Sequence, residues 1–220
     1  MTEMTGPATR PVTGVLLAGG LGRRMGGGDK PLKTLGGRAI LDLVVDRALP
    51  QVDALVLNVN GDVARFAEYD LPIAEDVIEG YAGPLAGILT GMEWSRRTSP
   101  DAHWMVSFAT DAPFFPTDMV QRLIDETVST GADMACAQTC GRTHPVFALW
   151  PVNLADELRR AMVDDDMRKI DRWTGQYKIL HVDFDRPEPE IDPFFNINRP
   201  EDLIAAENWL QDQKTVGKVT

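Results

Sequence analysis

Short apolar segments that alternate with segments of helical periodicity constrain the fold of this chain more than any other feature. Val12–Ala18 and Ala54–Val59 are apolar runs of strand length, and Ala39–Leu49 between them has apolar residues at helical spacing. The same alternation continues along the chain and predicts a mostly parallel, doubly wound sheet covered by helices on both faces. We therefore expect one α/β domain of three layers over residues 12–210, with flexible termini at 1–11 and 211–220.

The other elements are predicted by the same periodicities. Strands are expected at 71–74, 104–109, 134–138, 145–150 and 177–184, and helices at 84–97, 117–128, 153–162, 167–173 and 200–210. Thr117 is the expected N-cap of its helix, and Thr139–His144 is the expected turn between two strands.

Composition excludes several classes of protein. The chain has 44% hydrophobic and 25% charged residues, as a globular protein does. It has neither a run of ~20 apolar residues, which would span a membrane, nor the apolar stretch of a signal peptide at Met1–Pro11. We therefore expect a cytoplasmic protein without a membrane partner. The net charge of −11 argues against nucleic acid as a partner.

The two cysteines, Cys136 and Cys140, are too few for a disulfide framework, and a single C-x-x-x-C is a poor zinc site. We interpret them as reduced thiols in or near a strand, without a catalytic role.

A glycine-rich, basic segment follows the first predicted strand. Gly19–Arg38 carries five basic residues and one acid, a net charge of +4 within an acidic protein. Glycine lets a backbone approach a ligand closely, so a strand followed by glycines, cations and a helix indicates a phosphate-binding loop. The two commonest types do not match. Met25 stands where the dinucleotide fingerprint needs glycine, and Gly28-Asp29-Lys30-Pro31 lacks the hydroxyl of a P-loop.

Polar residues follow the predicted strands at four points: the Gly19 loop, Asn58, Asp76 and Asp111. Ligands bind beyond the carboxyl ends of strands in doubly wound sheets, so these residues predict one ligand-binding edge. A carboxylate such as Asp111 suits Mg²⁺, which takes one or two carboxylates together with phosphate oxygens and waters. Structural alternatives are a strand-end cap for Asn58, a helix cap for Asp76 and a turn for Asp111.

Five groups of short motifs occur in order along the chain: LAGG, RMG and DK within 17–30, GPLAG at 83–87, TDAP at 110–113, HP at 144–145 and NINRPEDL at 196–203. In this combination the chain resembles the molybdenum cofactor guanylyltransferases over roughly residues 12–210, with Thr110 in place of the family's cysteine. The resemblance implies a Rossmann-like nucleotidyltransferase fold. It also implies transfer of GMP from GTP to the phosphate of molybdenum-molybdopterin, with release of pyrophosphate.

The resemblance further assigns roles to single residues. Arg24, Lys30 and Asp111 are expected to be catalytic, with Asp111 as the Mg²⁺ ligand. Asn196 and Asn198 are expected to contact the acceptor, with a second contact to the metal as the alternative for Asn198. The expected contacts of the nucleotide are Leu17, Ala18, Gly19, Lys30, Asn58, Asp76 and Asp111. Arg23 is a further candidate for the phosphates, with a solvated side chain as the alternative, and His144 is either structural or acceptor-binding. Expected partners are GTP, molybdenum-molybdopterin, and molybdoenzymes or their chaperones.

Other functions fit the sequence less well. A molybdenum cofactor cytidylyltransferase or another NTP-dependent nucleotidyltransferase would share the chemistry, but the resemblance associates Gly19-Gly20 with guanine. Lys30 and Asp111 argue against a non-catalytic carrier, and Met25 argues against an NAD oxidoreductase. Because a phosphomonoester is largely dianionic at neutral pH, the attack on the NTP needs no general base. This agrees with a sequence that has no Ser/His/Asp or Cys/His arrangement.

Overall fold

The computed structural model describes residues 11–18, 30–80, 83–185 and 191–216. Seven strands form one sheet in the order β5-β4-β1-β6-β8-β7-β9. These strands are β1 Val12–Leu17, β4 Ala54–Asn58, β5 Ile73–Ala74, β6 Trp104–Ala109, β7 Met134–Thr139, β8 Arg142–Pro151 and β9 Ile179–Asp183. The short strands β2 (Thr34–Leu35) and β3 (Arg38–Ala39) form a separate antiparallel pair.

The α-helices are α1 Ile40–Ala48, α2 Pro84–Thr98, α3 Met119–Thr130, α4 Ala155–Asp164, α5 Ile170–Thr174 and α6 Pro200–Val216. Short 3₁₀ helices span Lys30–Leu32, Leu49–Gln51, Val63–Tyr69 and Val152–Leu154. Within the described part of the chain, no helix is both long and apolar enough to cross a membrane.

The sheet is mostly parallel, as predicted. β1 pairs in parallel with β4 on one side and with β6 on the other, and β4–β5 and β7–β9 are parallel as well. β8 is the exception, because it pairs antiparallel with both β6 and β7. The reversal arises in the β7–β8 hairpin, whose tight turn at Cys140 and Gly141 has positive φ at both residues.

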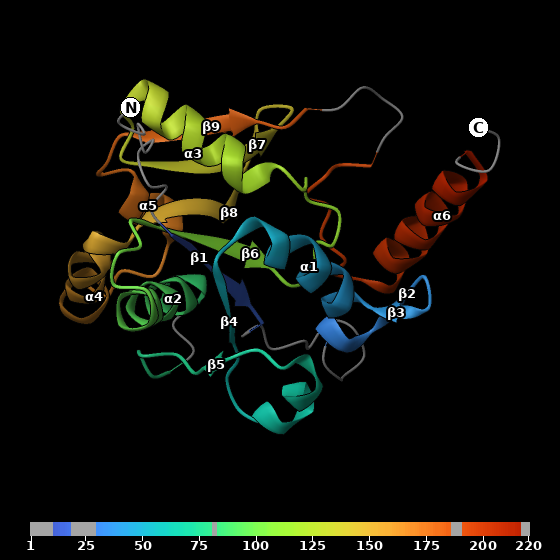
Figure 1. The fold of residues 1–220 in the computed structure, drawn as a ribbon, viewed down its shortest axis with the longest axis horizontal. Coiled ribbons are helices and arrows are strands. Elements are labelled where there is room, and N and C mark those ends of the chain that lie inside the picture. Colours follow the sequence, from blue (N-terminus) through green and yellow to red (C-terminus); the bar gives the residue numbers. More distant parts are fainter. Residues whose placement is uncertain (1–10, 19–29, 81–82, 186–190, 217–220) are drawn as a thin grey trace, which may run out of the picture.

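Two hydrophobic cores confirm the three-layer prediction. Neighbouring strand residues alternate between them: Leu16 packs with α1, α3 and α6, whereas Val15 packs with α2, α4 and α5. The alternation follows from the two-residue period of a strand, which directs successive side chains to opposite faces. Figure 1 shows α1 and α3 on one side of the sheet, and α2, α4 and α5 on the other.

Several boundaries differ from prediction, with α3 as the clearest case. Its N-cap residue is Asp118, not Thr117, and the Asp118 side chain makes no capping hydrogen bond. Instead the Gln51 side-chain oxygen accepts the Val120 amide at 3.0 Å, and its amide nitrogen donates to the Pro116 carbonyl at 3.1 Å. A partner this distant in sequence satisfies the free amide that a local cap would otherwise take. α5 begins at Ile170 rather than Met167, and α6 continues beyond the predicted end to Val216.

Helix α2 approaches the sheet unusually closely through Gly87 and Gly91, which lie one turn apart. A Cβ atom added at Gly91 would lie 2.8 Å from Cβ and Cγ1 of Val15, and one at Gly87 would meet Leu17 and Asn58. The two glycines therefore set the depth at which α2 packs on β1 and β4.

We predict that Gly91→Ala destabilises the protein. Alanine favours a helix by about 1 kcal/mol over glycine, but Val15 is fully buried and, being β-branched, cannot move away easily. Overpacking of this kind costs about 1–3 kcal/mol. Urea unfolding followed by circular dichroism measures the change.

The control for this prediction is the double variant Gly91→Ala/Val15→Ala, in which the clashing methyl groups are gone. Its loss should be smaller than the sum of the two single losses. An unchanged or increased free energy of unfolding for Gly91→Ala alone would contradict the close packing.

Candidate active site

The carboxyl ends of β1, β4 and β6 meet at one edge of the sheet. Leu17, the last residue of β1, is in register with Asn58 of β4 and Ala109 of β6. The Ala18 amide donates to the Asn58 carbonyl at 2.9 Å, and the Thr110 hydroxyl donates to the Leu17 carbonyl at 3.0 Å. The predicted residues Leu17, Ala18, Asn58 and Asp111 therefore lie along one hydrogen-bonded edge.

Lys30, Asp111 and Asn198 form the central cluster at this edge. The Lys30 Nζ donates to Asp111 Oδ2 and to Asn198 Oδ1, both at 2.5 Å. The Lys30 and Asp111 side chains are only 14% and 24% exposed, so bulk water screens the pair less than it screens a surface ion pair. Asp111 and Asn198, which lie 81 and 168 positions after Lys30 in the sequence, thus bind the same ammonium group.

Each member of the cluster lies at or next to the end of a different type of element. Lys30 begins the 3₁₀ helix Lys30–Leu32, Asp111 follows β6 by two residues, and Asn198 precedes α6 by two residues. The Ile197 amide donates to the Asp111 carbonyl at 2.8 Å, so the chain before α6 is fixed directly to the end of β6. Asn196 lies on this same segment and is half-buried.

Asp202 fixes the backbone at Asn198. One of its carboxylate oxygens accepts the amides of Asn198 and Arg199, each at 2.8 Å. A carboxylate in the first turn of a helix is well placed to accept such free amides and to interact with the helix dipole. Asp202 lies within the NINRPEDL motif, which did not by itself predict a role for it, although an acid three residues after Arg199 is the usual signal of this cap.

Asn58 and Asp76 form a second cluster on the β4 side. Asn58 Nδ2 donates to Asp76 Oδ1 at 2.9 Å and to the Ala74 carbonyl at 3.1 Å, and Asn60 Nδ2 donates to Asp76 Oδ2 at 2.7 Å. The Asn60 side-chain oxygen in turn accepts the Asp76 amide at 2.9 Å. Asn58 is 2% exposed and lies against Gly87. Its buried side chain therefore holds the Asp76 carboxylate from the protein interior. The half-buried Asp76 is the more accessible of the two.

His144 packs against the segment that carries Asn196 and Asn198. It is 6% exposed, its Nε2 lies 2.7 Å from the Thr139 hydroxyl oxygen, and its ring lies 4.7 Å from that of Phe194. Asp192, whose Oδ2 is 4.0 Å from the His144 Nε2, accepts the Phe194 amide at 2.8 Å. Burial lowers the pKa of His144, against the opposing effect of the Asp192 charge. Thr139 and Asp192 had no signal in the sequence, because their role depends on a long-range contact.

Some predicted residues lie outside this site or outside the described residues. Gly19, Arg23 and Arg24 fall in the second group, so their positions stay predictions. Neither Cys136 nor Cys140 forms a disulfide in the described part of the chain, which agrees with the interpretation of both as reduced thiols. Burial raises the pKa of Cys136 to about 12, which keeps its thiol protonated at neutral pH. In the described segments, no group of three or more His, Cys, Asp or Glu side chains could enclose a metal ion.

Comparison with known proteins gives a consistent result. Residues 14–179 match the family described as MobA-like NTP transferase domain. A molybdenum cofactor guanylyltransferase from Rhodopseudomonas palustris (strain BisB5) is 51% identical over 91% of this chain and 95% of its own. One from Mesorhizobium japonicum is 44% identical over 92% of this chain and 97% of its own.

Solved structures agree with the sequence relatives. The crystal structure of molybdopterin-guanine dinucleotide biosynthesis protein A from Archaeoglobus fulgidus has a TM-score of 0.72 and 25% identity, over 91% of this chain and 99% of that one. Rv0371c from Mycobacterium tuberculosis, at 20% identity and a TM-score of 0.65, shares the fold over 92% of this chain and 100% of its own. The chain therefore belongs to the molybdenum cofactor guanylyltransferases, within the family of MobA-like NTP transferase domains.

Proposed function

We propose that this protein transfers GMP from GTP to the phosphate of molybdenum-molybdopterin, which yields the guanine dinucleotide form of the cofactor. An oxygen of the acceptor phosphate bonds to the α-phosphorus of GTP, the bond from that phosphorus to the β-phosphate oxygen breaks, and pyrophosphate leaves. The observation that carries the proposal is the convergence of Lys30, Asp111 and Asn198 at the ligand-binding edge. Because the attacking oxygen is already anionic, the residues here need to position and neutralise charge rather than remove a proton.

The oxygens at this edge fit Mg²⁺. Asp111 offers one carboxylate and Asn198 one amide oxygen, and hard oxygen ligands of this kind, completed by phosphates and water, are what Mg²⁺ takes. The Lys30 ammonium, itself a cation, lies between these two oxygens. Asp111 and Asn198 would hold the ion, which would supply charge stabilisation to the triphosphate. Lys30, and Arg24 by resemblance, would then donate hydrogen bonds to phosphate oxygens.

Asp76 gives a physical reason for a preference for guanine. A carboxylate can accept two parallel hydrogen bonds from the ring N–H and 2-amino group of guanine, whereas cytosine has no such pair of donors. Asn58 and Asn60 hold this carboxylate with one hydrogen bond to each oxygen, which leaves further lone pairs for a base. Leu17, Ala18 and Gly19 would complete the base site through their backbone. Molybdoenzymes or their chaperones as recipients, and a cytoplasmic location, remain predictions from the sequence.

The first prediction from this proposal concerns Asp111. Asp111→Asn keeps the shape of the side chain but removes the charge that favours Mg²⁺, and a metal stabilises phosphoryl charge by several kcal/mol. We expect a loss of well over about 100-fold in turnover from the folded protein. Guanylyl transfer assayed against Mg²⁺ and Mn²⁺ concentration, with circular dichroism, measures both properties.

Asp101→Asn is the matched control, because Asp101 is an exposed aspartate just before the opposite end of β6. It should leave turnover unchanged. Partial rescue of Asp111→Asn by raised Mg²⁺ or by Mn²⁺ would support the metal assignment. Full activity at ordinary Mg²⁺ would make Asp111 a turn residue only, since asparagine substitutes well in turns.

The second prediction concerns the base. We expect kcat/KM to be much higher for GTP than for CTP, and Asp76→Asn to reduce this ratio, because an amide cannot accept both guanine hydrogen bonds. The loss for GTP should be about 10- to 100-fold, as for a hydrogen bond to a charged group. Equal values for GTP and CTP in the wild-type protein would overturn the assignment of guanine. An unchanged ratio in Asp76→Asn would remove Asp76 from the base site and leave GTP as the donor.

A further inference from the structure

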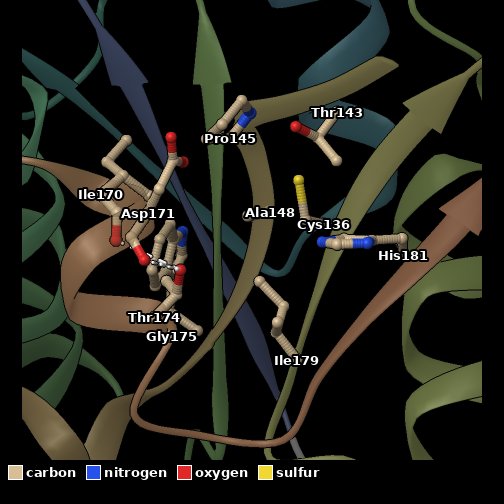
Figure 2. Close-up of a pocket in the computed structure, with 11 residues that line it drawn as sticks. Cys136, Thr143, Pro145, Ala148, Ile170, Asp171, Thr174, Gly175, Ile179 and His181 are labelled. Atoms are coloured by element: carbon tan, nitrogen blue, oxygen red, sulfur yellow. Dashed lines mark hydrogen bonds between the residues drawn. The ribbon is translucent and has the colours of Figure 1, made fainter. Parts of the chain in front are cut away.

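A pocket lies between α5 and strands β7, β8 and β9, apart from the cluster around Lys30. Its volume is about 230 Å³. Figure 2 shows Ile170 and Asp171 of α5 on one wall, with Cys136 and His181 of the neighbouring strands across from them. The walls are mainly apolar, which suits a small uncharged ring rather than an ion.

The register of β8 connects this pocket with the active-site edge. Ala148 in the pocket is paired with Ser107 of β6, and the strands are antiparallel. Residues that precede Ala148 therefore run beside those that follow Ser107, toward Asp111. Ser107 lies four residues before Asp111, roughly 13 Å along an extended chain. The pocket residues Thr143 and Pro145 lie nearer to the edge than Ala148 does.

His144 shows that β8 separates two functional surfaces. It lies between Thr143 and Pro145 in sequence, but its ring contacts Phe194 on the segment that carries Asn196 and Asn198. Thr143 and Pro145 line the pocket instead. The first residues of β8 thus contact the segment that carries Asn196 and Asn198 on one face and form the mouth of the pocket on the other.

The charge of the pocket indicates which part of the proposed acceptor, its ring or its phosphate, could bind there. Among the described residues that line it, Asp171 is the one carboxylate, and there is no lysine or arginine. A phosphate would be repelled, whereas a ring with N–H donors would be attracted. Cys136 offers no thiolate, because burial raises the pKa of its thiol to about 12. The pocket therefore suits a neutral ring that has paired donors on one edge.

We propose that this pocket binds the pterin ring of the acceptor, with the Asp171 carboxylate accepting hydrogen bonds from its ring N–H and 2-amino group. The inference rests on the proposed function, which supplies a phosphorylated pterin as the acceptor. The ring lies against the apolar walls, and the phosphate end extends past Thr143 and Pro145 toward Lys30. Guanine has the same donor edge, but the base site proposed for it is at Asn58 and Asp76, on the other side of β1 and β6.

A binding experiment with the full chain tests the pocket independently of turnover. The probe is free pterin (2-amino-4-oxopteridine), titrated by its fluorescence with and without saturating GTP and Mg²⁺. Lumazine, which has an oxygen in place of the 2-amino group, is the matched ligand. Pterin should bind more tightly than lumazine, and GTP should not displace it. Asp171→Asn should weaken pterin binding about 10- to 100-fold, as expected for hydrogen bonds to a charged group.

Two further variants make the test specific. Asp164→Asn, which changes an exposed aspartate at the end of α4 outside the pocket, should bind pterin as the wild-type protein does. Thr143→Trp should obstruct the mouth and weaken pterin and lumazine alike. In the transfer assay, Asp171→Asn should raise the KM for the acceptor and leave the KM for GTP unchanged.

The pocket and the proposed function can fail separately. Unchanged pterin affinity and acceptor KM in Asp171→Asn, with normal guanylyl transfer by the wild-type protein, would overturn the pocket alone. Displacement of pterin by GTP, or a raised KM for GTP in Asp171→Asn, would show instead that the pocket takes guanine. Absence of guanylyl transfer by the wild-type protein, whatever its affinity for pterin, would overturn the proposed function.

Discussion

The pairing of β1 on both sides is the constraint on which the rest of the structure depends. β4 and β6 align with β1 in parallel, so the residues that follow all three strands emerge at one edge. β1 also separates the two cores, with Leu16 in one and Val15 in the other. Gly91 of α2 packs against Val15, and Gly87, on the preceding turn of that helix, packs against Asn58. The position of β1 therefore determines both where the edge of the site lies and how closely α2 packs against the sheet.

The sequence predicted those parts of the fold that local periodicity determines. β6 was predicted residue for residue, because Trp104–Ala109 is an apolar run bounded by polar residues. The start of α3 was wrong because the amide that Thr117 was expected to cap is served by Gln51, whose proximity only the folded chain creates. The antiparallel course of β8 follows from a turn of two residues, shorter than the predicted Thr139–His144. Local sequence patterns do not predict the boundaries of helices and strands that tertiary contacts determine.

The site shows the same division between residue identity and residue environment. Motifs predicted Lys30, Asp111 and Asn198 as functional residues, and the structure brings them together. Motifs could not reveal that Asn58 is buried and that its side-chain amide donates both of its hydrogen bonds to other groups of the protein. As a result, Asp76 is the side chain of this pair that is accessible at the edge. Nor could they find Thr139 and Asp192, which act through contacts with His144. Sequence patterns name the groups that meet ligands more readily than the groups that hold them in place.

The contact between Lys30 and Asp111 bears on how the proposed nucleotide and metal ion would bind together. The Lys30 ammonium offsets the negative charge of the Asp111 carboxylate at this edge. If Asp111 and Asn198 held a metal ion as proposed, the ion would displace an ammonium that bonds both oxygens, and a triphosphate bound to Lys30 would leave the carboxylate without this partner. With both ligands bound, the two oxygens would hold the ion and the ammonium would donate to phosphate oxygens, so each exchange would offset the cost of the other. Under the proposed function, Lys30 would therefore couple nucleotide binding to metal binding, and by linkage the coupling would act equally in both directions.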